Sequence, residues 1–183
     1  MNLPNALSLL RIFLVTPFLI AVIYHQFFVA LIIFVLAGIS DFFDGYLARR
    51  WRQQSLLGTF LDPLGDKLLI TVAFISLCIQ GLLPPWLVVT VVAKDVYSVI
   101  GTGVLYFSDN FSVAIPSLWG KLSTLLQIIA VGFALLSAFC TINTSLLDGL
   151  FAVTGLATAI AFFHYLWRGV EVFSAVTSHQ NGP

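Results

Sequence analysis

The sequence predicts an all-α polytopic membrane protein with six transmembrane helices and a short N-terminal interfacial helix. The chain of 183 residues is 60% hydrophobic and only 9% charged, and its mean hydropathy is +1.03. This composition excludes an ordinary soluble domain. Apolar segments long enough for bilayer-spanning helices recur along the chain. We therefore expect residues 1–183 to form a single membrane-embedded domain, and the net charge of zero gives no reason to expect a nucleic-acid partner.

The first segment, residues 1–24, begins as a mixed polar and apolar stretch and then becomes apolar. Asn5, Ser8 and Arg11 recur every three residues and would share one stripe of a helix, so we expect the first turns to lie at the membrane interface. The tail from Thr177 to Pro183 is expected to be disordered. The five later spans are predicted at about 27–48, 56–79, 86–107, 118–139 and 146–167.

Basic residues collect on one side of this predicted topology. The turns near residue 25, at 81–85 and at 141–145 contain no Lys or Arg. The opposite side, which also holds both termini, carries Arg49, Arg50, Arg52, Lys121 and Arg168. Because membrane proteins retain basic residues in the cytoplasm, we expect both termini and this side to be cytoplasmic, in a protein of a bacterial inner membrane.

Four of the eight acidic residues lie between positions 41 and 66, within or beside the second and third apolar spans. A carboxylate near a bilayer core costs about 2.5 to 3.5 kcal/mol on insertion scales, so these residues predict a functional site. The aspartates at 41 and 44 are three positions apart and those at 62 and 66 are four apart, so each pair projects from one helix face. Hard oxygen ligands suit divalent cations, and the two faces together predict a carboxylate cage for such ions.

These residues resemble the signature of the CDP-alcohol phosphotransferase family, also called CDP-alcohol phosphatidyltransferases. That signature reads D-x2-D-G-x2-A-R, eight residues, then G-x3-D-x3-D. Every fixed position is met, by Asp41, Asp44, Gly45, Ala48, Arg49, Gly58, Asp62 and Asp66. The resemblance extends more loosely over most of the chain, through the six apolar segments and the N-terminal run P-N-A-L-S-L-L-R.

The resemblance implies an enzyme that transfers a phosphatidyl group from CDP-diacylglycerol to an alcohol and releases CMP. It implies two divalent ions, Mg2+ or Mn2+, and no redox or organic cofactor; a homodimer is expected from the resemblance alone. The implied metal ligands are Asp41, Asp44, Asp62 and Asp66, with Asp66 also the general base. The implied nucleotide and phosphate contacts are Asn5, Gly45, Ala48, Arg49, Gly58 and Thr59. A second interpretation of Asn5 and Arg11 is a helix cap beside an Arg that reaches the interface.

The acceptor alcohol has two main candidates, with inositol phosphate, serine and choline as further alternatives. Relatives that use glycerol 3-phosphate carry an Arg-Glu pair on the fourth span and a further Arg, whereas this chain has Lys94 and Asp95 there. Adjacent helix residues point apart, so we expect one of these two to face the acidic site. The pair and the run from Pro116 to Gln127 resemble the cardiolipin-synthase branch, whose acceptor is phosphatidylglycerol. We favour this lipid, with glycerol 3-phosphate as the alternative; the expected acceptor-binding residues are Arg11, Lys94, Asp95 and Lys121.

Other interpretations fit parts of the sequence. Lys121 is also consistent with an interfacial Lys whose side chain reaches the membrane surface. A divalent-cation transporter would use intramembrane acids in six spans, but the acids cluster at one end and are not repeated in the second half of the chain. A non-catalytic scaffold does not explain costly acids that meet the signature at every position. Aspartates that only cap helix ends would explain one acid at each terminus, not two spaced pairs.

Overall fold

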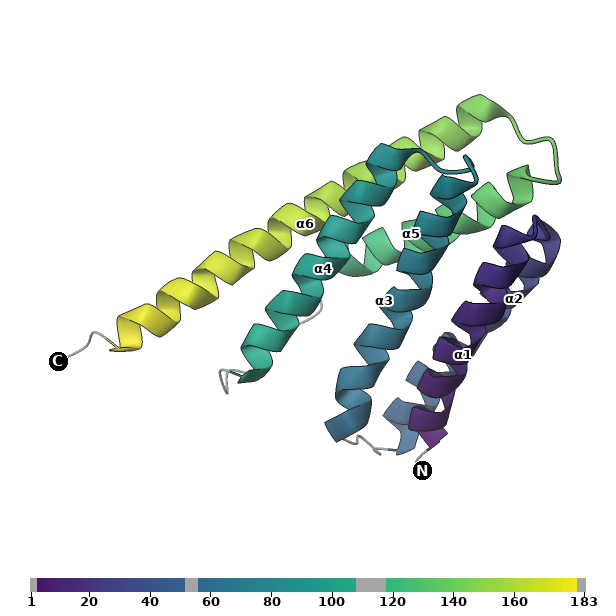
Figure 1. Ribbon diagram of the computed structural model, residues 1–183. Coiled ribbons are helices and arrows are strands. Elements are labelled where there is room, and N and C mark those ends of the chain that lie inside the picture. The colour runs from purple at the N-terminus through teal and green to yellow at the C-terminus, as the bar shows by residue number, and fades with distance from the viewer. Residues whose placement is uncertain (1–2, 52–55, 108–117, 181–183) are drawn as a thin grey trace.

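The computed structural model describes the backbone of residues 3–51, 56–107 and 118–180, and the side chains of residues 12–40, 67–101 and 118–167. This part of the chain is all-helical and contains no strand, which confirms the predicted all-α class. Figure 1 shows the arrangement of the helices in a bundle. In chain order they are α1 (Leu3–Ile23), α2 (Phe27–Trp51), α3 (Leu56–Ile79), α4 (Pro85–Phe107), α5 (Leu118–Ser137) and α6 (Thr144–Gln180).

Short turns join α1 to α2, α3 to α4 and α5 to α6 toward one end of the bundle, opposite the N-terminus of the chain (Figure 1). His25 and Gly81 take positive φ values of 57° and 75° in the first two turns. Glycine adopts this conformation without steric cost. Pro85 begins α4, a position where its missing N–H leaves no hydrogen bond unmade. The Asn143 side chain accepts a 2.9 Å hydrogen bond from Ser145 N and so caps α6.

Two predicted boundaries are wrong. The expected interfacial helix is not separate, because residues from Leu3 to Ile23 form one helix that continues through Pro17. α6 continues to Gln180, past the predicted end of the span at 167 and through part of the expected disordered tail. The segment from 168 to 180 contains no proline and one glycine, so nothing in it stops the helix when it leaves an apolar environment.

The core lies where these helices pack against one another. α1 packs against α2 and α3, while α4 and α5 both pack against α6. Phe18, Phe74 and Leu135 are completely buried in this core. Where α6 meets α4, a Cβ added at Gly155 would overlap the ring of Trp86. The absence of a side chain at Gly155 therefore makes room for Trp86 between α4 and α6.

Large apolar side chains also cover the outside of the bundle. Phe13, Val89, Leu118 and Phe163 are 67–81% exposed. Soluble monomers rarely present extended apolar surface of this kind. By length and composition, Leu118–Ser137 and Thr144–Trp167 can each cross a bilayer; Ile12–Ile23, Phe27–Ser40 and Lys67–Ile79 are shorter apolar helical stretches. The described residues thus contain two clear candidate spans, and the six-span topology stays a prediction.

Candidate active site

The four aspartates of the signature lie on two consecutive helices. Asp41 and Asp44 belong to the C-terminal half of α2, and Asp62 and Asp66 to the N-terminal half of α3. Since both segments are helical, each pair is spaced by about one turn, as expected. These halves of α2 and α3 lie at the same end of the bundle (Figure 1). The side chains lie outside the described residues, so the carboxylate cage itself stays a prediction.

The backbone brings the expected nucleotide contacts to the same end. Gly45, Ala48 and Arg49 follow the first aspartate pair on α2, and Gly58 and Thr59 precede the second pair on α3. Asn5 and Arg11 lie in the first half of α1, which starts at this end of the bundle (Figure 1) and packs against α2 and α3. The side chains of all these positions are likewise outside the described residues.

The donor set on α2 and α3 fits a divalent cation. Carboxylate oxygens are hard ligands, and four of them in a largely apolar segment need cations to balance their charge. Among the side chains that the structure describes, no group of three or more His, Cys, Asp or Glu residues is placed to hold a metal ion. We call the four aspartates of α2 and α3 the acidic site.

A second polar region begins on α4. Lys94 and Asp95 are only 4% and 5% exposed, and the Lys94 Nζ lies 2.9 Å from Asp95 Oδ1. Adjacent helix residues were not expected to face each other, yet the Lys94 side chain reaches the carboxylate of its neighbour. The expectation that one of the two faces the acidic site stays a prediction, because the side chains of the aspartates at 41, 44, 62 and 66 lie outside the described residues. A buried charge without a partner is strongly destabilising, so each residue stabilises the burial of the other.

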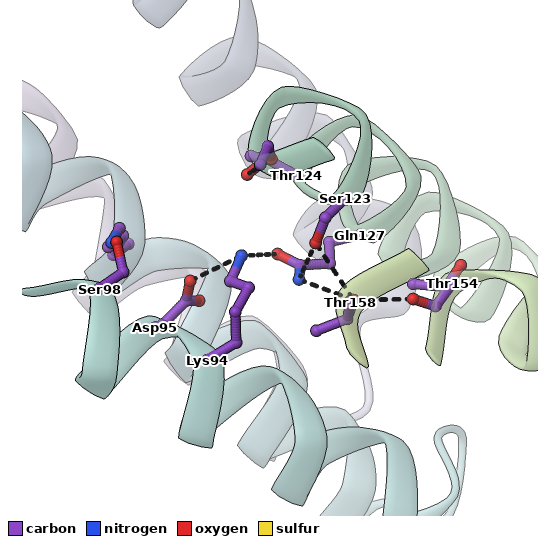
Figure 2. Close-up of polar contacts among 10 residues, drawn as sticks. Lys94, Asp95, Ser98, Ser123, Thr124, Gln127, Thr154 and Thr158 are labelled. Carbon is purple, nitrogen blue, oxygen red and sulfur yellow. Dashed lines mark hydrogen bonds and ion pairs between the residues drawn. The ribbon is translucent and has the colours of Figure 1, made fainter. Parts of the chain in front are cut away.

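Gln127 on α5 extends this pair toward α6 (Figure 2). Lys94 Nζ donates a long hydrogen bond of 3.5 Å to Gln127 Oε1. Gln127 Nε2 donates to Ser123 Oγ and to Thr158 Oγ1, both at 3.2 Å. Thr158 Oγ1 in turn donates to the backbone carbonyl of Thr154 at 2.7 Å. Ser123, Gln127, Thr154 and Thr158 are all completely buried, and we call these four residues the amide–hydroxyl cluster.

A further contact connects α3 with α4 near this region. Lys67, which directly follows Asp66 in the sequence, donates from Nζ to Ser98 Oγ at 2.5 Å. Ser98 is one helical turn beyond Lys94 and Asp95 on α4. The acid-bearing segment of α3 is therefore hydrogen-bonded, through its neighbouring lysine, to the turn of α4 that follows the ion pair.

The sequence analysis did not identify the amide–hydroxyl cluster. The available signal was a pair of polar residues four positions apart on each of two apolar spans, Ser123 with Gln127 and Thr154 with Thr158. Lys121, which was expected to bind the acceptor, is exposed and lies on the same helix two positions before Ser123. Its exposure is compatible with both interpretations given above, an acceptor contact and an interfacial lysine.

The chain thus carries two spaced pairs of acids on α2 and α3 and a buried ion pair on α4. The chain belongs to the CDP-alcohol phosphatidyltransferase family, whose model matches residues 1–167. It is 33% identical to a probable cardiolipin synthase (CMP-forming) of Drosophila melanogaster, over 96% of this chain and 60% of that protein. It is 32% identical to a cardiolipin synthase (CMP-forming) of Homo sapiens, over 93% of this chain and 64% of that protein.

Another relative carries a different name. The chain is 39% identical to a probable phosphatidylglycerophosphate synthase of Mycobacterium tuberculosis, over 74% of this chain and 66% of that protein. The chain spans 60–64% of the length of the two cardiolipin synthases. Both names describe proteins similar to this chain, and they correspond to the two acceptors that the sequence left open.

Proposed function

We propose that this protein is a phosphatidyltransferase that forms cardiolipin from CDP-diacylglycerol and phosphatidylglycerol. The acceptor hydroxyl oxygen attacks the phosphorus of the phosphatidyl group, the bond from that phosphorus to CMP breaks, and the hydroxyl proton passes to a base. The observation that carries this proposal is the signature met at all eight fixed positions, in a chain whose family match covers residues 1–167.

The residues of the acidic site divide these tasks. Asp41, Asp44 and Asp62 are proposed to hold two divalent ions, Mg2+ or Mn2+, together with Asp66. Bound divalent ions would neutralise the charge on the phosphates and stabilise the leaving CMP. Asp66 takes the proton from the acceptor hydroxyl as general base. Arg49 supplies a bidentate contact to a phosphate.

The nucleotide is proposed to lie against the same ends of α1, α2 and α3. Gly45, Ala48 and Gly58 are small, so cytidine and its phosphates can approach the backbone closely. Thr59 and Asn5 offer polar contacts to the nucleotide or its phosphates. These roles follow from the signature and from the position of each residue on its helix.

We further propose that residues 1–183 form one membrane domain with six spans, in a bacterial inner membrane, that works as a homodimer. The apolar exterior and the distribution of basic residues support the membrane position and the cytoplasmic placement of both termini. The acidic site then opens to the compartment in which a CDP-activated lipid presents its nucleotide. The acyl chains of the donor stay in the bilayer beside the helices.

Phosphatidylglycerol is the proposed acceptor because of the charge on α4. Lys94, Asp95 and the nearby Lys67, which interacts electrostatically with both, carry only one net positive charge, which is too little for the dianion of glycerol 3-phosphate. Similarity to proteins named cardiolipin synthase over 93–96% of the chain also supports the lipid acceptor. Glycerol 3-phosphate is the second candidate, supported by 39% identity to a protein named phosphatidylglycerophosphate synthase over 74% of the chain. Arg11 and Lys121 would add the positive charge that this anion needs.

The test uses the purified full chain in detergent with CDP-diacylglycerol and Mg2+ or Mn2+. CMP release and the lipid product are measured with phosphatidylglycerol or with glycerol 3-phosphate in separate reactions. We expect cardiolipin and CMP in equal amounts, with loss of both when EDTA removes the metal. Release of CMP without a metal, or without an acceptor-dependent product, would contradict the proposed reaction, and phosphatidylglycerol phosphate alone would identify the second candidate as correct.

A further inference from the structure

The hydrogen bonds of the amide–hydroxyl cluster run in one direction. Thr158 Oγ1 donates its only proton to the carbonyl of Thr154, so it can only accept from its other neighbours. Ser123 Oγ lies 3.2 Å from Thr158 Oγ1 and must therefore be the donor between these hydroxyls. Both oxygens then accept from the Gln127 amide nitrogen. Every donor in this chain of contacts is assigned, and the direction runs from α5 to α6.

This directionality fixes the orientation of the Gln127 side chain. Its NH2 group faces two hydroxyl oxygens, so its carbonyl oxygen must face the opposite way, toward the Lys94 ammonium (Figure 2). A flipped amide would point its NH2 group at a cation and its oxygen at acceptors. Because Gln127 is completely buried, water cannot compensate for that mismatch. The cluster thus presents one fixed acceptor to Lys94.

Lys94 is held from two sides by this arrangement. Asp95 Oδ1 accepts from it at 2.9 Å within α4, and Gln127 Oε1 accepts from it across the α4–α5 contact at 3.5 Å. An ammonium group has three N–H donors, so these two acceptors leave room for one more. The direction of that third donor is set by the two contacts. A lysine with a flexible four-carbon stem is converted into a donor of defined direction.

We propose that Gln127, oriented by Ser123 and Thr158, is a positioning residue that aims the Lys94 ammonium at the phosphodiester of a lipid acceptor. This inference rests on the proposed function and adds to it a determinant of acceptor choice. Lys94, Asp95 and the nearby Lys67, which interacts electrostatically with both, carry one net positive charge. A phosphodiester carries one negative charge, which suits this balance and a single directed donor from Lys94. A phosphomonoester dianion gains less, because desolvating two charges requires more than one excess cation.

The test compares Gln127→Met and Thr158→Val with the wild type in mixed micelles. The mole fraction of phosphatidylglycerol that gives half the maximal rate is measured, together with the same quantity for CDP-diacylglycerol. Loss of a hydrogen bond to a charged group weakens binding about tenfold or more. Gln127→Met should therefore raise the half-maximal mole fraction of phosphatidylglycerol about tenfold. Thr158→Val leaves Ser123 as a partner of the amide and should raise it less, about threefold. The value for CDP-diacylglycerol should stay within about twofold of wild type.

Thr124→Val is the matched control, because Thr124 is on the same helix and donates at 3.1 Å to the Gly120 carbonyl of that helix. Figure 2 shows Thr124 beside the cluster without a contact to it. This variant should leave both half-saturation values unchanged. Should Gln127→Met fail to fold, Thr158→Val and Ser123→Ala each remove a single hydroxyl and must shift the acceptor value in the same direction.

The outcomes separate this inference from the proposed function. A wild type that gives no phosphatidylglycerol-dependent CMP release would overturn the proposed function and this inference with it. A wild type that makes cardiolipin, with variants that lose only kcat or thermal stability and keep the wild-type acceptor value, would overturn the inference alone. That second result would assign the cluster to packing of α5 against α6.

Discussion

The two polar regions of this protein are built in different ways. The acidic site draws four like charges from two consecutive helices, and it is favourable only when cations enter. The region around Lys94 combines one opposite-charge pair on α4 with an amide and hydroxyls from α5 and α6, and these groups hydrogen-bond to one another. The first arrangement calls for external charge and suits catalysis on phosphates. The second is fixed in direction and leaves one N–H of Lys94 for a ligand, which suits recognition.

The largest expected effects belong to the acidic site. Asp66→Asn should lower kcat by about 10²- to 10⁴-fold, because the acceptor hydroxyl loses its base. Mn2+ binding, measured by calorimetry on the same preparation, should weaken less in this variant than in Asp62→Asn, because the three other aspartates remain. Asp62→Asn should lose both metal binding and turnover. Near-normal turnover of Asp66→Asn with an intact metal site would show that Asp66 is not the base.

The next effect concerns the ion pair on α4. Lys94→Met leaves Asp95 buried without its partner, which should lower the free energy of unfolding by about 3 to 5 kcal/mol. The double variant Lys94→Met with Asp95→Leu removes both charges and should recover most of that stability. It should not recover the affinity for phosphatidylglycerol. Thermal unfolding in detergent and the half-saturation value for phosphatidylglycerol measure the two consequences separately. Wild-type affinity for phosphatidylglycerol in the double variant would show that Lys94 does not recognise the acceptor.

A substitution between α4 and α6 should disturb the region around Lys94 and leave the acidic site unchanged. Gly155→Ala places a methyl group into the Trp86 ring and should cost about 1 to 3 kcal/mol of stability. Gly149→Ala is the matched control on α6, since an added Cβ there meets nothing within 4 Å. Acceptor affinity should fall in Gly155→Ala while Mn2+ binding stays at the wild-type level. Equal losses of acceptor affinity and Mn2+ binding would mean that the region around Lys94 and the acidic site do not act independently.

The smallest effect is expected at Lys121. Because this residue is exposed, Lys121→Ala should change the free energy of unfolding by less than about 0.5 kcal/mol. If it contacts the acceptor, the half-saturation value should rise about threefold at low salt and return toward wild type at high salt. An unchanged value at low salt would favour the interfacial lysine and would leave acceptor recognition to Lys94 and Arg11.

The sequence predicted those features whose signals are local. Long apolar runs gave the all-α class and helix positions close to those observed, and spacings of three and four residues placed each aspartate pair one turn apart. The end of α6 was not predicted, because Trp167 and Arg168 mark the edge of an apolar run but do not stop a helix. The sequence therefore marks the end of the apolar run, but not the end of the helix that contains it.

The contacts between Lys94 and the amide–hydroxyl cluster could not be predicted, because they join residues that are far apart in the sequence. Gln127 and Thr158 are 31 positions apart, and Lys94 and Gln127 are 33 apart. A lone glutamine in an apolar span does not indicate which helix it will face. The pairing of Lys94 with Asp95 also depends on a side-chain conformation that the spacing of adjacent residues argues against. Only the packing of α4 and α5 against α6 brings these groups together.

A competition between the two acceptors tests the central claim most directly. Purified wild-type protein is given CDP-diacylglycerol, Mn2+ and equimolar phosphatidylglycerol and glycerol 3-phosphate, and the lipid products are quantified by mass spectrometry. We predict that cardiolipin is the main product and that its formation matches the release of CMP. Phosphatidylglycerol phosphate as the main product would contradict the lipid-acceptor assignment, and it would mean that the Lys94 region does not select a phosphodiester.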